Sequence, residues 1–178
     1  MWNYQKRGGR NLSLTSNSKG NVSVEVIMIV TILFAFSIVA IVTYDFFGDI
    51  MDNVIADPDI SATATAPTEG LHARYPSVFD NAYIIILIAL WIGAIVSAFQ
   101  IDTYPIFMGL SVLALIIVLI VPPILGNAFE ETFADETASG LTDSFPAMFF
   151  IMTHILEISI FIGASVVIAL YAKSRMGI

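Results

Sequence analysis

The sequence predicts an all-α integral membrane protein with four transmembrane helices and both termini on the same, internal side of the membrane. Of the 178 residues, 57% are hydrophobic and only 12% are charged, whereas soluble domains carry about 25% charged residues. Four apolar stretches are each long enough to cross a bilayer core of about 30 Å as a helix. Basic residues gather on one side of these stretches and acidic residues on the other, which is the positive-inside pattern.

Composition also excludes several classes of function. A net charge of −8 argues against nucleic-acid binding by the chain as a whole, because such binding needs an excess of Lys and Arg. The lack of cysteine removes disulfide frameworks and thiol catalysis, and two histidines, His72 and His154, are too few for most structural metal sites. No phosphate-binding, dinucleotide-binding or nucleophile-elbow motif occurs. We therefore expect no catalytic site, no metal and no cofactor.

Residues 1–20 are polar and rich in Gly, Ser and Asn, which predicts a flexible basic arm before the first span. The basic residues of this arm are Lys6, Arg7, Arg10 and Lys19. Orientation of the first helix is sufficient to explain these charges. A second interpretation is contact with anionic lipid head groups or with packaged nucleic acid.

Residues 21–55 are predicted to form the first span, from about Val22 to Tyr44, and an amphipathic extension. In the extension, apolar residues recur at helical spacing, while Asp45, Asp49 and Asp52 take the opposite face. This acidic face is expected outside the membrane, in contact with water or with a basic protein partner.

The start of the first span carries a short motif, KGNVSVE, in which Gly20 precedes Glu25 by five residues. With the basic arm before it and the apolar helix after it, the motif resembles the N-terminal signature of type IV prepilins and archaeal class III signal sequences. The resemblance implies cleavage after Gly20 and a Glu25 that seats one subunit against another in a filament. The three further spans depart from the pilin pattern of one helix and a soluble domain. The other interpretation is that Glu25 only favours the positive end of the helix dipole and the mature protein keeps Met1.

Residues 56–81 are expected to be an acidic external linker, because they are rich in Pro, Ala and Thr and show no helical period. Residues 82–125 follow as a hairpin of the second and third spans, joined by the short internal turn QIDTY. Pro122 and Pro123 should end or kink the third span, because proline lacks an amide N–H and its ring clashes with the preceding turn.

Small residues predict two helix faces that can pack closely, since helix backbones approach one another in lipid where side chains are short. The helix-packing residues are Ala89, Gly93 and Ser97 in the second span and Ser159 and Gly163 in the fourth. Such faces support helix association within the chain or between copies, so a homo-oligomer is among the partners considered.

Residues 126–145 form the second external loop, which is acidic and contains no Lys or Arg. Phe129 and Phe133 are four residues apart, the spacing of one helix face, and predict a short acidic helix beyond the two prolines. The positive-inside rule places this loop outside. Its partner-facing acids are Glu130, Glu131, Asp135 and Glu136.

Residues 146–178 form the fourth span, from Pro146 to about Ala172, and a basic internal tail that contains Lys173 and Arg175. Within this span His154 and Glu157 are three residues apart on one helix face, with Glu157 close to mid-membrane.

This intramembrane polar pair is the strongest anomaly in the spans. No Lys or Arg lies in any span to pair with Glu157, so its carboxyl is expected to be neutral or hydrogen-bonded to His154 or to a hydroxyl. An ionisable group at this depth is costly and points to a proton relay or an ion path. The alternative is a static pair that locks helix packing, which the scarcity of other polar residues in the spans favours.

Together these features favour a structural multi-pass membrane protein of a larger assembly. The overall plan is similar to that of minor membrane proteins in the internal membrane of tailless icosahedral viruses, where lipid lies between genome and capsid. That resemblance implies a virion membrane component whose partners are the lipid bilayer and other membrane or coat proteins. Three alternatives stay open: an accessory subunit of a cellular membrane complex, a small transporter or channel that uses His154 and Glu157, and a pilin-like, filament-associated protein.

Overall fold

A computed structural model describes residues 22–57, 62–100, 105–133 and 138–176. Throughout these ranges the regular structure is helical, without strands, which confirms the all-α prediction. The helices are α1 (Val22–Ile55), α2 (Ala62–Gln100), α3 (Pro105–Val118), α4 (Val121–Thr132), α5 (Ala138–Ser144), α6 (Pro146–Thr153) and α7 (Ile155–Met176).

Within the described ranges, four helical stretches are long and apolar enough to cross a membrane: Ser23–Ile55, Thr65–Gln100, Gly109–Thr132 and Ile155–Met176. They correspond to α1, to α2, to α3 with α4, and to α7. At a rise of about 1.5 Å per residue, each reaches across a bilayer core of about 30 Å. The chain is an integral, multi-pass membrane protein.

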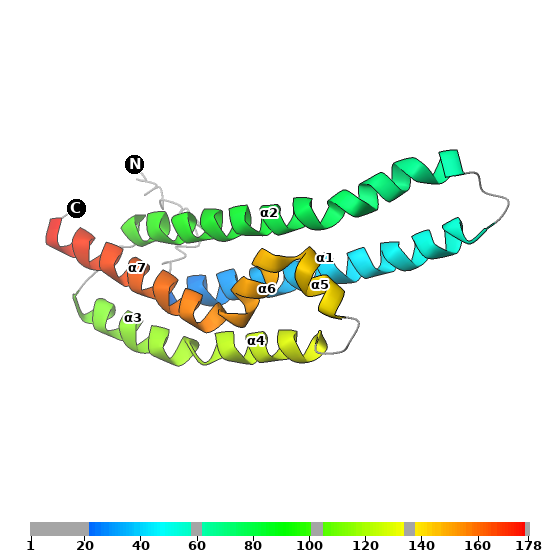
Figure 1. Ribbon diagram of the computed structural model, residues 1–178. Coiled ribbons are helices and arrows are strands. Elements are labelled where there is room, and N and C mark those ends of the chain that lie inside the picture. The colour runs from blue at the N-terminus through cyan, green and yellow to red at the C-terminus, as the bar shows by residue number, and fades with distance from the viewer. Residues whose placement is uncertain (1–21, 58–61, 101–104, 134–137, 177–178) are drawn as a thin grey trace, which may run out of the picture.

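The four spans run alternately up and down (Figure 1). The start of α1 and the end of α7 lie at the same end of the bundle, where α2 also ends and α3 begins. Lys173 and Arg175 stand in the last turn of α7, at this end. By the positive-inside rule it faces the internal side, and we call it the internal end.

At the opposite end, α1 and α2 continue past the rest of the bundle as a two-helix arm (Figure 1). The first of them extends without a break to Ile55, as the amphipathic pattern predicted. Residues 56–81 were expected to form a linker without helical structure, but α2 begins at Ala62 and includes most of this range. Aromatic contacts explain the helix: Tyr75 stacks on Phe79 at 4.0 Å between ring centroids, and Phe79 stacks on Phe36 of α1 at 6.0 Å. The first contact lies within α2, but the second joins two helices, so no local period in the sequence reveals it.

The third span is interrupted at Leu119–Ile120, between α3 and α4. Proline occupies the first turn of α4, where its missing N–H and fixed φ are tolerated. The predicted kink at Pro122 and Pro123 is confirmed. Phe129 and Phe133, predicted to share a helix face, lie 4.9 Å apart between ring centroids at the end of α4.

The fourth span is also interrupted, which the sequence did not predict. A continuous helix was expected over residues 146–172, but His154, with φ −110° and ψ 24°, separates α6 from α7. The break lies beside two side chains that compete for backbone carbonyls. The Thr153 hydroxyl lies 2.9 Å from the Phe149 oxygen, and the His154 Nδ1 lies 2.9 Å from the Phe150 oxygen. Such local bonds offer the backbone an alternative to the regular ladder.

The hydrophobic core forms where α1 meets α2 and α7. Leu33 of α1, Tyr83 of α2 and Val166 of α7 are fully buried there. Gly163 belongs to this packing, since a Cβ on it would lie 3.0 Å from the Leu115 side chain of α3. The spans therefore associate through apolar contact and close approach, as is usual for helices in lipid.

Candidate functional site

The break between α6 and α7 carries the polar pair that the sequence singled out. The His154 Nδ1 lies within hydrogen-bond distance of the Phe150 oxygen and of the Thr153 hydroxyl, at 2.9 Å and 3.0 Å. Its ring stacks on Phe150, with centroids 4.5 Å apart. Glu157 follows in the first turn of α7. Across the described part of the chain, no hydrogen bond or ion pair engages Glu157, so the expected bond to His154 is not formed.

Both residues lie on the outside of the bundle. Thr153, His154 and Glu157 are exposed, and exposed apolar side chains of Phe150 and Phe161 flank them. The pair consequently neither locks packing inside the chain nor lines a path between the described spans. Sequence reasoning identified the residue types but not the direction in which they point.

Gly126 of α4 lies behind the break and was not singled out by the sequence. A Cβ on this residue would lie 3.1 Å from the Met152 carbonyl oxygen and 3.0 Å from the Ile155 side chain. The absence of a side chain lets α4 approach the backbone where α6 ends and α7 begins. The signal that could have suggested this contact is a glycine a few residues after two prolines in an apolar stretch.

Near the internal end, Glu25 and Ser97 meet between α1 and α2. The Ser97 hydroxyl donates a hydrogen bond to Oε1 of Glu25, whose other oxygen is buried without a partner among the described residues. Glu25 stands in the first turn of α1, as the helix-dipole interpretation requires. The prepilin resemblance assigned Glu25 to a contact between subunits, whereas this contact is within the chain. Gly20, the residue before the implied cleavage point, lies outside the described residues.

The two small-residue faces differ in what they touch. Ser159 is buried, and Gly163 packs against Leu115, so the face on α7 serves packing within the chain. On α2, Ala89 and Gly93 are exposed, and nothing lies within 4 Å of a Cβ built on Gly93. Ser97 is half-buried and belongs to the contact with Glu25.

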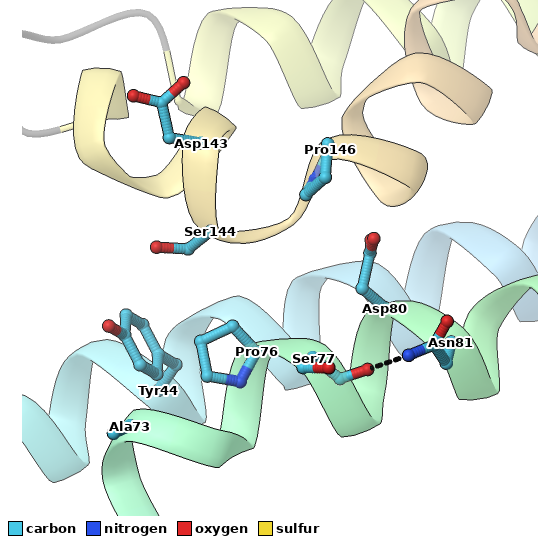
Figure 2. Close-up of a pocket in the computed structure, with 9 residues that line it drawn as sticks. All are labelled: Tyr44, Ala73, Pro76, Ser77, Asp80, Asn81, Asp143, Ser144 and Pro146. Carbon is cyan, nitrogen blue, oxygen red and sulfur yellow. Dashed lines mark hydrogen bonds between the residues drawn. The ribbon is translucent and has the colours of Figure 1, made fainter.

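Asp80 joins α2 to the start of α6 (Figure 2). Its carboxylate accepts backbone hydrogen bonds from Ala147 at 3.0 Å and from Met148 at 2.8 Å. Both N–H groups are unpaired donors of a helix start, which a carboxylate satisfies well. An open groove of about 410 Å³ adjoins this contact, with carboxylates, hydroxyls and an amide in its lining. The lining residues are Tyr44, Ala73, Pro76, Ser77, Asp80, Asn81, Asp143, Ser144 and Pro146.

Sequence reasoning counted Asp80 among the acids of an external loop and missed its structural role. Its hydrogen-bond partners lie 67 and 68 positions further along the chain. A capping signal is normally read over about three residues, so no local motif could have revealed it.

The charged residues at the two ends occupy surfaces of different sign. Glu130 and Glu131 are exposed near the end of α4, and Asp135 and Glu136 lie outside the described residues. Arg175 is exposed and donates from Nε to the Tyr171 hydroxyl at 3.2 Å, whereas Lys173 is buried. Of the other five basic residues, Arg74 is exposed on α2, in the external arm, and Lys6, Arg7, Arg10 and Lys19 precede the described residues.

Within the described ranges, no three His, Asp or Glu residues gather as a group that could hold a metal ion. Three polar features stand out among the described residues: the break at His154, the contact of Glu25 with Ser97, and the Asp80 groove. Compared with family models, curated proteins and solved structures, the chain has no match.

Proposed function

We propose that this protein is a structural component of a larger membrane-bound assembly and that its external arm engages a protein layer outside the bilayer. The observation that carries the proposal is the arm itself, formed by the outer parts of α1 and α2. The 34 residues of α1 extend over about 51 Å, against about 30 Å of bilayer core. The excess of about 21 Å places roughly two fifths of the helix beyond the bilayer core.

The surface of the arm fits a protein partner. Large apolar side chains that a protein in water normally covers are exposed on it. They are Phe46, Phe47, Ile50 and Ile55 of α1 and Leu71 and Val78 of α2. Asp45, Asp49 and Asp52 are exposed on the same stretch of α1. Acidic and apolar groups together favour a partner surface that is basic around an apolar centre.

The most specific form of the proposal is a virion membrane component that bridges the bilayer and a protein shell. The acidic arm and the exposed Glu130 and Glu131 would face the shell, and the basic residues of the internal end and of residues 1–20 would face the genome side. An accessory subunit of a cellular membrane complex would use the same surfaces and differs only in the identity of the assembly.

One observation favours a transporter or channel as the second candidate function. Two spans are interrupted, at Leu119–Ile120 and at His154, and discontinuous helices are common in transporters. Against this candidate, Thr153, His154 and Glu157 lie on the outside of the bundle and do not face one another across a cavity. The scaffold function therefore has the stronger support.

The test is to fix the native assembly with a zero-length carbodiimide reagent, which joins carboxylates to neighbouring lysines, and to identify the linked residues by mass spectrometry. We expect links from Asp45, Asp49 and Asp52 to one coat or complex protein. The triple replacement of these residues by Asn should weaken copurification of that protein, most clearly at low salt, because high salt already screens these ion pairs in the unmodified protein.

Glu157→Gln is the matched control, because it neutralises an acid outside the arm. It should leave the association unchanged. Proton or cation flux through the purified protein in liposomes, lost in Glu157→Gln, together with no links from the arm, would contradict the scaffold function.

A further inference from the structure

The outer face of the fourth span carries polar groups that the chain itself does not cover. We propose that this face, formed by Thr153, His154 and Glu157 with the exposed Phe161 and Ala164 of α7, binds the same face of a second copy of this chain within the membrane. The proposal goes beyond the structural function above and requires only that α7 crosses a membrane.

Glu157 lies at a depth where lipid surrounds an exposed side chain. It precedes Lys173, at the internal end, by four and a half helical turns, a rise of about 24 Å. A bilayer core of about 30 Å therefore still encloses Glu157. The exposed side of α7 at this level faces hydrocarbon unless another protein covers it.

The polar atoms on this face differ in whether the chain itself supplies a hydrogen-bond partner. The Thr153 hydroxyl bonds to carbonyls of its own helix, and the His154 Nδ1 lies 2.9 Å from the Phe150 oxygen. The Nε2 of His154 and the carboxyl of Glu157 remain, and no hydrogen bond to either is formed within the described residues. Intramembrane ionisable groups nearly always face protein or water, because exposure to lipid is costly. These two groups therefore need a partner from outside the chain.

A second copy offers the complementary groups at the correct height. A carbonyl oxygen only accepts, so the Nδ1 of His154 carries the hydrogen directed at Phe150 and the neutral ring presents Nε2 as an acceptor. A protonated Glu157 carboxyl can donate to that Nε2. In a twofold dimer, Glu157 of each copy meets His154 of the other copy. Two such Glu157–His154 bonds therefore form and leave neither group unpaired.

The surrounding surface permits close approach of two helices. Phe150, Ile160, Phe161 and Ile168 are exposed beside the polar pair. Ala164, also exposed, lies two helical turns after Glu157 and so on the same face. A small side chain at this position lets two copies of α7 come together, with large apolar side chains on either side.

The chain lacks cysteine, which makes a cross-linking test direct. The full-length protein carrying Ala164→Cys is reconstituted in lipid vesicles and oxidised over a range of protein-to-lipid ratios. We expect a disulfide-linked dimer. Leu113→Cys, at another exposed apolar position, on α3, is the matched control and should cross-link much less.

Two variants then test the basis of the contact. Glu157→Leu, in the Ala164→Cys background, should reduce dimerisation about tenfold, the effect of losing two membrane hydrogen bonds, whereas Glu157→Gln should retain most of it. Ala164→Phe should block dimerisation sterically, as measured by energy transfer between labelled copies in vesicles. Thr31→Leu, which removes an exposed hydroxyl from α1, controls for the loss of any polar group in a span and should change nothing.

Glu157 and Ala164 are exposed in the single chain, so both replacements should leave its fold intact, and circular dichroism in detergent checks this. Three outcomes overturn the proposal: a wild-type chain that is monomeric at every protein-to-lipid ratio, cross-linking as fast through Leu113→Cys as through Ala164→Cys, or dimerisation unaffected by both Glu157→Leu and Ala164→Phe. A monomeric chain whose Ala164→Cys instead cross-links to a different membrane protein in the native membrane also overturns it.

Discussion

Asp80 fixes the junction between two helices that are far apart in the sequence. It is 9% exposed, and its two oxygens accept the N–H groups of Ala147 and Met148 in the first turn of α6. Phe145 occupies the N-cap position of α6, but its side chain has no hydrogen-bond acceptor and so cannot cap the helix. A carboxylate from a neighbouring helix supplies the missing cap and anchors the short α6 to α2.

Replacing Asp80 by Ala removes both acceptors and should lower the free energy of unfolding by about 1–2 kcal/mol, the usual cost of losing a helix cap. Asp80→Asn keeps one acceptor oxygen and should lose less. The measurement is a denaturing-detergent titration of the full chain, followed by circular dichroism. Asp49→Ala, at an exposed position on α1, is the control and should change stability by less than about 0.5 kcal/mol; equal losses in the two variants would contradict the cap.

At the scale of the elements, the interruptions in the third and fourth spans have different causes. The third span breaks before Pro122 and Pro123, whose rings prevent a regular helix from continuing through the preceding turn. The fourth breaks at His154 without a proline, beside side-chain bonds to the Phe149 and Phe150 carbonyls. Gly126 brings α4 against this second break. The helix that follows the first interruption is therefore packed against the second interruption through one glycine.

Gly126→Ala tests that packing. The added Cβ would lie 3.1 Å from the Met152 carbonyl oxygen, a backbone atom that cannot turn aside, and 3.0 Å from the Ile155 side chain. Gly93→Ala is the matched control, because the space around that glycine is open. Both changes gain helix propensity, so the comparison isolates the clash. Gly126→Ala should be less stable than Gly93→Ala by about 1–2 kcal/mol in the same titration, and equal stability would show that α4 does not approach the break closely.

At the scale of the whole molecule, charge is distributed between the two ends of a four-helix bundle. The internal end holds Lys173 and Arg175, and the external end holds the acidic arm of α1 and α2 with Glu130 and Glu131. This asymmetry orients the chain in the membrane. Under the proposed function the two sides would engage different partners, since an acidic surface attracts basic groups and a basic one attracts anionic head groups.

Single cysteines at exposed positions report this orientation. Ser174→Cys should react with an impermeant thiol reagent only from the internal side, and Thr68→Cys and Asp143→Cys only from the external side. The measurement is labelling of sealed vesicles before and after permeabilisation. Reaction of Thr68→Cys from the same side as Ser174→Cys would exclude the four-span topology.

Several features of the candidate sites could be anticipated from residue type alone. Glu25 and Glu157 were identified because carboxyl groups in apolar stretches are rare and costly. Their surroundings could not be anticipated. Glu25 bonds to Ser97, 72 positions away, and Glu157 points out of the bundle because of how α7 packs on its neighbours. Periodicity places a residue on a face of its helix, and only packing decides what that face meets.

The sequence by itself determined the number of spans, their alternation and the sign of charge at each end. These properties follow from the transfer of each segment between water and lipid, which depends on local hydropathy and charge. Tertiary structure decided that α2 begins at Ala62, that the fourth span breaks at His154, and that Asp80 caps α6. The start of α2 and the cap on α6 depend on contacts between residues distant in the sequence, whose free energy no local pattern contains. The break at His154 has local side-chain bonds beside it, and Gly126 of α4, distant in the sequence, packs against it.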